Sequence, residues 1–271
     1  MHPPELQVTR QSGAGMGVSM PSHLAHAYRS RSQCVRVISE AWGEENLYCA
    51  NCDSPMLERS RPNTPAIDFL CPRCAAPFQL KCQSRPFSRK INDAGYEAMR
   101  RAIVEGRTPN LLALQYDPLV WTVRSVVLIP RFVFSLSCIE QRNPLRPTAR
   151  RKNWVGCHIV LTNIPPDARI SVIADGVPVS PALVRQQYRR LRPLEKLRPD
   201  ARGWTLDVLN VVRSLGKEKF SLDDVYIRSN DLQSLHPGNR HVREKIRQQL
   251  QCLRDLGVVV FLGRGRYALK S

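Results

Sequence analysis

Four cysteines in two close pairs limit the folds open to this chain. Two residues separate Cys49 from Cys52 and Cys71 from Cys74, and 18 residues lie between the pairs. This spacing is typical of a zinc site in which each pair occupies a tight turn and four thiolates converge on one ion. Four sulfurs leave no position for water, so we predict a structural Zn²⁺ site. The alternative is four unrelated buried thiols.

Cysteine usage also indicates where the protein works. The total of nine cysteines is odd, and zinc-type spacing is typical of a reducing compartment. The first residues contain no basic segment followed by an apolar stretch, so we expect no secretory signal. We therefore expect a cytoplasmic protein, in which the other cysteines pack in cores.

The charge balance points to a polyanionic partner. Lysine and arginine number 41 against 23 acidic residues, which gives a net charge of +18 at neutral pH. Nucleic acid is the leading candidate for such a basic chain. The alternative is an anionic membrane surface, but the basic residues are spread over both halves and no apolar run approaches the roughly 20 residues of a membrane span.

Hydrophobic periodicity predicts a mixed α/β (α+β) domain in the first two thirds. Residues 32–42 have helical spacing, and residues 64–81 form two short strands joined through the second cysteine pair, which predicts a hairpin with the metal at its tip. Residues 87–106 predict a helix that ends at a glycine, and 110–117 and 123–134 predict strands. Strands on both sides of a helix indicate a central sheet.

The remaining third predicts a separate domain. A polar, cationic stretch with two prolines runs through residues 184–202, and we place the domain boundary there. The rest of the chain predicts three helices and a hairpin with a Gly-Arg-Gly turn, which is the winged-helix variant of helix-turn-helix. We expect an extension or disordered segment over 1–27, a zinc-containing domain over 28–190 and a winged helix over 191–271.

A second candidate site surrounds the second cysteine pair. Asp68 ends the strand before this pair, and Gln79 and Lys81 lie in the strand after it. Because side chains alternate along a strand, Gln79 and Lys81 can share a pocket with Asp68. This arrangement resembles the PD-(D/E)xK nuclease motif, in which a carboxylate holds a divalent ion and a lysine orients or deprotonates the attacking water. Asp68 is then the first metal ligand, the Leu80 carbonyl a second, and Lys81 the base or electrostatic stabiliser. The alternative is a surface salt bridge.

The last predicted helix combines an apolar stripe with a basic side. Val242, Ile246, Leu250 and Leu253 form the stripe. Arginine can donate twice to guanine and glutamine can pair with adenine in the major groove, so we expect the polar side to read bases. The candidate residues of this side are Arg240, Arg243, Arg247 and Gln248. Arg264 and Arg266 of the glycine-rich turn are candidates for DNA backbone or minor-groove contacts. A solvated structural helix is the alternative.

Several stretches of the chain resemble the DpnI family of restriction endonucleases. They are YCANC, AIDFLCPRCAAPFQLK, FSRKINDAGYEAM, RPTARRKNWVGCHI, RGWTLDVLN, HVREKIRQQLQCLRDLGVV and GRGRY, and they run from about residue 28 to the C-terminus. The resemblance implies a monomeric bacterial type II enzyme of a restriction-modification system, with a zinc site and a winged helix. It implies Mg²⁺-dependent cleavage of double-stranded DNA at GATC sites with methylated adenine.

One residue departs from the family pattern. Asp68 and Lys81 coincide with the family's motif positions, but Gln79 stands where the family has a glutamate. An amide in place of a carboxylate removes one negative charge from the first shell of a hard cation and weakens the site. The amide oxygen of Gln79 can still ligate, so we keep it as a candidate metal ligand.

The resemblance also marks a tryptophan in the basic loop. Trp154 matches a tryptophan of the family, and an indole offers a flat apolar surface that gains contact energy from a methyl group. We expect Trp154 to recognise the methyl group. The resemblance supports this role, since a lone tryptophan is more often a core residue. Its neighbours Arg150, Arg151 and Lys152 are expected to contact phosphates.

Three functions remain open on the sequence. The first is a methyl-directed endonuclease. The second is a methyl-DNA-binding protein that kept the fold with weakened or lost cleavage, which Gln79 favours. The third is a zinc-ribbon transcription factor, which leaves the match at Asp68 and Lys81 unexplained.

Overall fold

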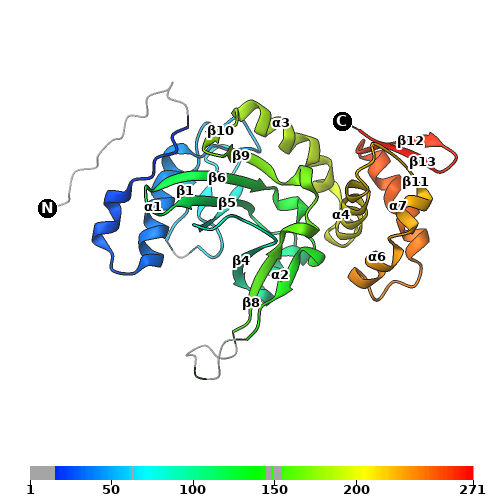
Figure 1. Cartoon of the computed structure of the whole chain (residues 1–271), viewed down its shortest axis with the longest axis horizontal. Coiled ribbons are helices and arrows are strands. Elements are labelled where there is room, and N and C mark those ends of the chain that lie inside the picture. The colour runs from blue at the N-terminus through cyan, green and yellow to red at the C-terminus, as the bar shows by residue number, and fades with distance from the viewer. Residues whose placement is uncertain (1–15, 63, 145–147, 149–153, 271) are drawn as a thin grey trace.

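A curled seven-stranded sheet forms the centre of the larger, N-terminal part of the protein (Figure 1). The computed structural model describes residues 16–62, 64–144, 148 and 154–270. The strands of this sheet, in spatial order, are β1 (Glu58–Arg59), β2 (Phe69–Leu70), β3 (Pro77–Gln83), β5 (Asn110–Asp117), β6 (Thr122–Ile129), β9 (Ile170–Ala174) and β10 (Val177–Pro178). Strands β3 and β5 are parallel, and the other neighbours are antiparallel.

A smaller, three-stranded sheet takes its first strand from the crossover that joins the parallel strands β3 and β5. Its other two strands come later in the chain. It has the order β4-β8-β7, with β4 (Lys90–Gly95), β8 (Gly156–Val160) and β7 (Ile139–Gln141). Helix α2 (Tyr96–Val104) follows β4 and contacts all three strands. In Figure 1 the β8 hairpin extends away from the large sheet and leads to the part of the basic loop outside the described residues.

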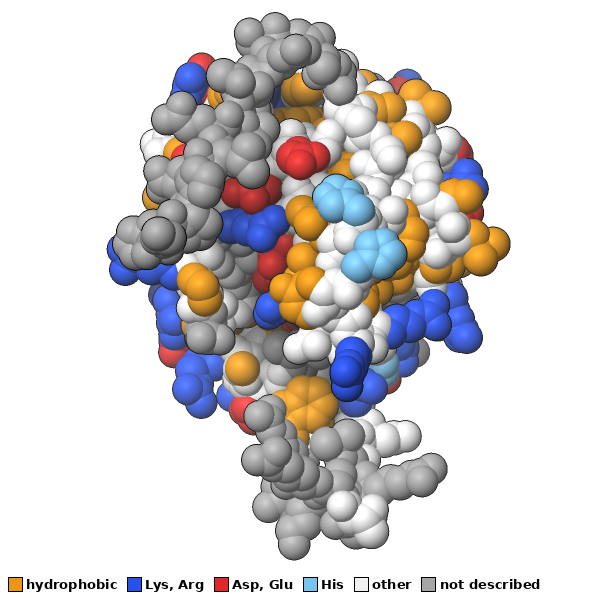
Figure 2. Space-filling model, turned by 90° about the vertical axis from the view of Figure 1, so that its left-hand side faces the viewer, with side chains coloured by type: hydrophobic (Ala, Val, Ile, Leu, Met, Phe, Trp, Pro, Cys, Tyr) orange, Lys and Arg blue, Asp and Glu red, His pale blue; other side chains and the backbone are white. Residues whose placement is uncertain are grey.

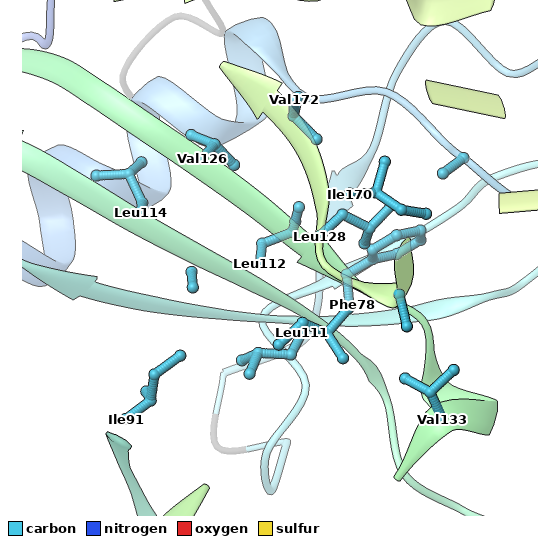
Figure 3. Packing of buried hydrophobic residues seen from close by; sticks show 14 of the residues in the cluster. Phe78, Ile91, Leu111, Leu112, Leu114, Val126, Leu128, Val133, Ile170 and Val172 are labelled. Atoms are coloured by element: carbon cyan, nitrogen blue, oxygen red, sulfur yellow. The ribbon is translucent and has the colours of Figure 1, made fainter. Parts of the chain in front are cut away.

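Helices cover the large sheet. Helix α1 (Arg31–Asn46) contacts β1 and β3, and α3 (Pro181–Leu191) contacts β9. Apolar side chains of β3, β5, β6 and β9 meet between these layers, where Figure 3 shows Phe78, Leu112 and Leu128 close to Ile170. Burial of such side chains, worth about 1.5–3 kcal/mol each, is the main source of stability for a fold of this kind.

The C-terminal part has its own apolar core. It contains α4 (Pro199–Ser214), α5 (Leu222–Tyr226), α6 (Ser229–Leu235), α7 (Val242–Asp255) and a three-stranded sheet of β11 (Lys219–Ser221), β13 (Arg266–Leu269) and β12 (Val259–Gly263). The predicted stripe of α7 is confirmed, because Val242, Ile246, Leu250 and Leu253 are all buried in this core. Helices followed by a β-hairpin give the winged-helix arrangement. None of the described helices is long and apolar enough to cross a membrane.

The structure corrects the helix that the sequence predicts over 87–106. Residues Lys90–Gly95 form strand β4, and the helix begins only at Tyr96. Ile91 and Asp93 are buried while Asn92 between them is exposed, which is the two-residue period of a strand. Pairing with β8, more than 60 residues later in the chain, decided this conformation, and local periodicity could not reveal it.

Helix α3 continues to Leu191, within the stretch in which the sequence places the domain boundary, and buries Val184 and Tyr188 against the first core. Two other expectations change. The strand expected over 123–134 ends at Ile129, since Pro130 has no N–H for a sheet bond. The second of the three helices expected in the C-terminal domain is divided into α5 and α6.

Part of the expected N-terminal extension packs on the body of the protein. Met20 is buried, and its backbone N–H donates to the Trp121 carbonyl at 2.8 Å. The Trp42 indole N–H of α1 donates to the Gly17 carbonyl at 3.0 Å. The rest of the expected extension, residues 1–15, lies outside the described residues.

Candidate functional site

The four predicted zinc ligands meet in the structure. Helix α1 leads into the turn that holds Cys49 and Cys52, and the β2–β3 hairpin holds Cys71 and Cys74 at its tip. Their sulfur atoms all lie within 4.8 Å of one another, with 3.6 Å between Cys49 and Cys74 and 3.5 Å between Cys52 and Cys71. Four sulfurs at about 2.3 Å from a central Zn²⁺ are roughly 3.8 Å apart. The cluster therefore fits one tetrahedral ion.

Donors around Cys71 favour the thiolate form that a metal requires, whereas burial raises the pKa of Cys49 and Cys52. Backbone N–H groups of Ser54 and Cys74 point at Cys52 and Cys71, at 3.5 and 3.4 Å from the sulfurs. Burial is the largest influence on the pKa of Cys71 and raises it. Hydrogen bonds from the backbone of Cys74 and Arg73 and from neighbouring thiols outweigh burial and lower the pKa to about 7.

An arginine from a distant helix holds the first cysteine turn. The Nε atom of Arg185 in α3 donates to the carbonyls of Cys49 at 3.0 Å and Cys52 at 2.9 Å, and Nη2 donates to the Ser54 carbonyl at 2.9 Å. Its guanidinium also lies over the Tyr48 ring, 5.1 Å from the centroid. Arg185 fixes the backbone of this turn against the main domain, and no local sequence signal identifies it.

A groove of about 1140 Å³ follows the edge of β3. Strand β2 pairs only with the first two residues of β3, so the edge beyond them is open. Asp68 occupies this edge, and its Oδ2 accepts a hydrogen bond from the Leu80 backbone N–H at 2.7 Å. The N–H and C=O of one strand residue leave on the same side, so the Leu80 carbonyl faces the same edge.

The groove brings together all the residues of the second candidate site that the sequence predicts. Asp68, Gln79, Leu80 and Lys81 line it, and Gln79 is buried to 6 % exposure. Burial raises the pKa of Asp68, while the Leu80 N–H and the Lys81 ammonium oppose this rise. A carboxylate, a backbone carbonyl and an amide oxygen form the donor set that Mg²⁺ prefers, with one carboxylate fewer than the family motif. These residues fit a hard divalent cation.

Two further acids belong to this region, and neither was predicted from the sequence. Glu40 of α1 lines the groove, and burial is the main influence that raises its pKa, with Arg36 lowering it and Asp68 raising it. Asp93 of β4 has a side chain only 2 % exposed, and its Oδ1 lies 2.7 Å from Lys81 Nζ. The period of α1 could have placed Glu40 toward the sheet, but only the position of β4 brings Asp93 to Lys81.

Trp154 lies against the small sheet. A Cβ atom added at Gly95 would lie 3.3 Å from the indole Nε1, and one added at Gly156 would lie 2.9 Å from Cη2. The indole therefore packs on two residues that have no side chain, and it is partly exposed. Arg150, Arg151 and Lys152, the predicted phosphate contacts beside it, lie outside the described residues.

The basic side of α7 faces solvent. Arg243, Arg247 and Gln248 are exposed on this helix, and both arginines lie over the Tyr226 ring, at 5.1 and 5.7 Å from the centroid. Arg240 precedes the helix and lines a groove of about 590 Å³ with Lys245 and Gln248. Stacking on an aromatic ring holds an arginine side chain extended, which preorganises its donors.

The wing carries the remaining basic candidates. Arg264 and Arg266 are exposed at the turn between β12 and β13. Gly263, Arg264 and Gly265 all have positive φ, so this turn requires its two glycines. Figure 2 shows the opposite end of the molecule, where Lys and Arg side chains are also spread over the surface. The excess positive charge is therefore not confined to the C-terminal domain.

Comparison with known families covers almost the whole chain. A family model described as DpnI, Dam-replacing family, matches residues 16–197. A second model described as DpnI_C, Dam-replacing HTH domain, matches residues 200–269. The first match contains the cysteine cluster and the β3 groove, and the second begins in α4 and contains the basic face of α7 and the wing.

Proposed function

Because the chain belongs to the DpnI (Dam-replacing) family, we propose that it is a metal-dependent type II endonuclease that cuts double-stranded DNA at adenine-methylated, GATC-like sites. The observation that carries the proposal is the groove at the free edge of β3, which is lined by Asp68, Gln79, Leu80 and Lys81. A positively charged protein with an acid–lysine groove and a helix-turn-helix domain has the parts that DNA cleavage requires.

Each residue of the groove has a proposed part in phosphodiester hydrolysis. Asp68, the Leu80 carbonyl and the Gln79 amide would hold Mg²⁺, which supplies Lewis-acid activation of the scissile phosphate. The Asp68 carboxylate is already oriented by the Leu80 N–H. Lys81 presents its ammonium in the same groove, where it would orient water or stabilise charge on the phosphate.

DNA recognition is assigned to two surfaces. Trp154 on the small sheet would contact the methyl group, and Arg150, Arg151 and Lys152 beside it would hold phosphates. The exposed residues Arg240, Arg243, Arg247 and Gln248 would read the major groove, and Arg264 and Arg266 would contact the backbone or the minor groove. The winged helix thus adds a second DNA-binding surface to the nuclease domain.

The proposal is tested by digestion of matched plasmids. Zinc-loaded protein with Mg²⁺ is expected to cut plasmid with methylated GATC adenine and to spare the same plasmid without methylation. Lys81→Ala is the matched inactive control. For Trp154→Ala, we expect the preference for methylated over unmethylated DNA to fall by a larger factor than the cleavage rate of methylated DNA. Intact methylated plasmid after incubation with folded, zinc-loaded protein would reject the proposal.

Gln79 favours a second candidate function, a methyl-DNA-binding protein with weakened cleavage. Two unit charges about 4 Å apart interact by roughly 4 kcal/mol at an effective dielectric constant of 20, and a divalent cation doubles this figure, before desolvation offsets part of it. Gln79→Glu is therefore expected to raise Mg²⁺ affinity and cleavage rate at least about tenfold. Methyl-dependent retardation of DNA without nicking, even in Mn²⁺, together with cleavage by Gln79→Glu, would establish this second function.

A further inference from the structure

The Lys81 ammonium is joined to a buried acid of the other sheet. Asp93 Oδ1 lies 2.7 Å from Lys81 Nζ, and the Asp93 side chain is 2 % exposed against 25 % for Lys81. Among the described residues, Asp93 Oδ1 accepts no hydrogen bond of good geometry, and its polar contact is the ion pair with Lys81. A charge buried in this way is costly unless it is paired, so Asp93 depends on Lys81.

Strand β4 also carries Gly95, one of the two glycines on which the Trp154 indole packs. Asp93 pairs with Cys157 and Gly95 with Gly156, and a β-bulge lies between these two positions of β4. The indole of Trp154 rests on Gly95 and Gly156, where an added Cβ would lie 3.3 and 2.9 Å from its atoms. A single residue of β4, Ala94, therefore separates Gly95, which contacts the indole, from Asp93, which contacts the ammonium.

Because Asp93 and Gly95 lie so close along β4, the contact of Asp93 with the Lys81 ammonium and the contact of Gly95 with the indole depend on each other. The Tyr96 N–H donates to the Val155 carbonyl at 3.0 Å, directly after β4, and this bond fixes the backbone on both sides of the indole. Packed backbone does not deform freely, so a shift of the indole is passed to the strand beneath it. The carboxylate two residues earlier then sets where the Lys81 ammonium lies in the groove.

We propose that Asp93 is a positioning residue that ties the Lys81 ammonium to the sheet under Trp154, so that contact with a methylated base and placement of the ammonium at the scissile phosphate depend on one strand. This inference rests on the proposed endonuclease function. It adds that methyl recognition controls the cleavage step as well as binding.

The test compares Asp93→Asn with Glu140→Gln. Glu140 forms an ion pair of the same 2.7 Å length with Lys90 in the same small sheet, but both side chains are exposed. The readouts are single-turnover cleavage of methylated and unmethylated duplexes in Mg²⁺, binding of the same duplexes in Ca²⁺, and thermal unfolding. Asp93→Asn is expected to bind methylated duplex within about twofold of wild type but to cut it about 100-fold more slowly, because misplacement of a catalytic group by about 1 Å costs that much. Glu140→Gln is expected to cut at the wild-type rate.

The outcomes separate the inference from the function on which it rests. If wild type cuts methylated DNA and folded Asp93→Asn cuts it equally fast, the positioning role is wrong while the endonuclease function stands. If Asp93→Asn loses rate only in proportion to unfolded protein, the pair is merely structural and the inference is overturned. If wild type does not cut, both proposals fail.

A stability cycle tests the ion pair without any cleavage. Lys81→Ala leaves the buried Asp93 carboxylate without its partner and is expected to lower the melting temperature. Adding Asp93→Asn is expected to recover most of that loss without restoring cleavage. Additive effects of the two substitutions would show that the side chains are not coupled and would remove the basis of the inference.

Discussion

The Asp68 carboxylate accepts a hydrogen bond from the Leu80 backbone N–H at 2.7 Å, across the edge that β2 leaves open on β3. The bond places a carboxylate and the Leu80 carbonyl at the same edge of the sheet, next to Gln79 and Lys81. Cys71 and Cys74 of the cysteine cluster lie at the tip of this hairpin, so an ion bound there and the Asp68 carboxylate would be held by the same pair of strands.

Removal of the Asp68 charge should weaken cation binding and leave the fold intact. Asn in place of Asp68 keeps an oxygen that can accept from Leu80 but loses the negative charge. We predict that Asp68→Asn weakens Mn²⁺ binding and slows cleavage by on the order of 100-fold or more, since loss of outer-shell contacts alone costs 10–100-fold. Calorimetric Mn²⁺ titration and plasmid digestion measure these effects. Unchanged Mn²⁺ affinity would remove Asp68 from the metal site.

Loss of one zinc ligand should destabilise the N-terminal domain. Cys71→Ser breaks the four-sulfur set, and structural zinc contributes folding free energy directly. We predict less than one zinc per chain by atomic absorption and a lower melting temperature. Cys34→Ser is the control, because Cys34 lies outside the cluster. Full zinc content in Cys71→Ser would contradict the four-cysteine site.

Arg185 should stabilise the first cysteine turn. Arg185→Ala removes a hydrogen bond from three carbonyl groups, of which, among the described residues, only that of Ser54 keeps another donor, the Cys49 N–H, and a hydrogen bond to a charged group contributes about 1.5–3 kcal/mol. We predict a decrease of about 2 kcal/mol in the free energy of unfolding, measured by urea denaturation. Arg189→Ala on the exposed side of α3 serves as the control. Equal effects of the two substitutions would argue against the stabilisation of the cysteine turn by Arg185.

Low pH should weaken the Asp224 hydrogen bonds that stabilise the start of α5. The hydrogen bond from Lys217, followed by those from the Ser221 backbone and hydroxyl, lowers the pKa of Asp224 from 3.8 to about 2. Its stabilising effect is therefore present above pH 3.8 and is lost as pH falls toward about 2. We predict that Asp224→Asn lowers the melting temperature at pH 7 and differs little from wild type near pH 2. A constant difference across this range would refute the linkage.

The sequence by itself determined the parts with local or chemical signatures. The spacing of Cys49, Cys52, Cys71 and Cys74 predicted a cluster that the structure forms, because a tight turn brings two cysteines together without help from the rest of the fold. The apolar stripe of α7 was likewise predicted, since burial on one side imposes a helical period. Two-residue alternation brought Gln79 and Lys81 to the groove of Asp68.

Only the tertiary structure decided what depends on distant segments. Residues Lys90–Gly95 have helical periodicity but form β4, because pairing with β8 satisfies their backbone groups. That pairing brings Asp93 to Lys81, and α3 brings Arg185 to the cysteine turn, over separations that no local pattern encodes. Side-chain periodicity shows which face of a segment is buried. Which residue of another segment packs against that face is decided only when the chain folds.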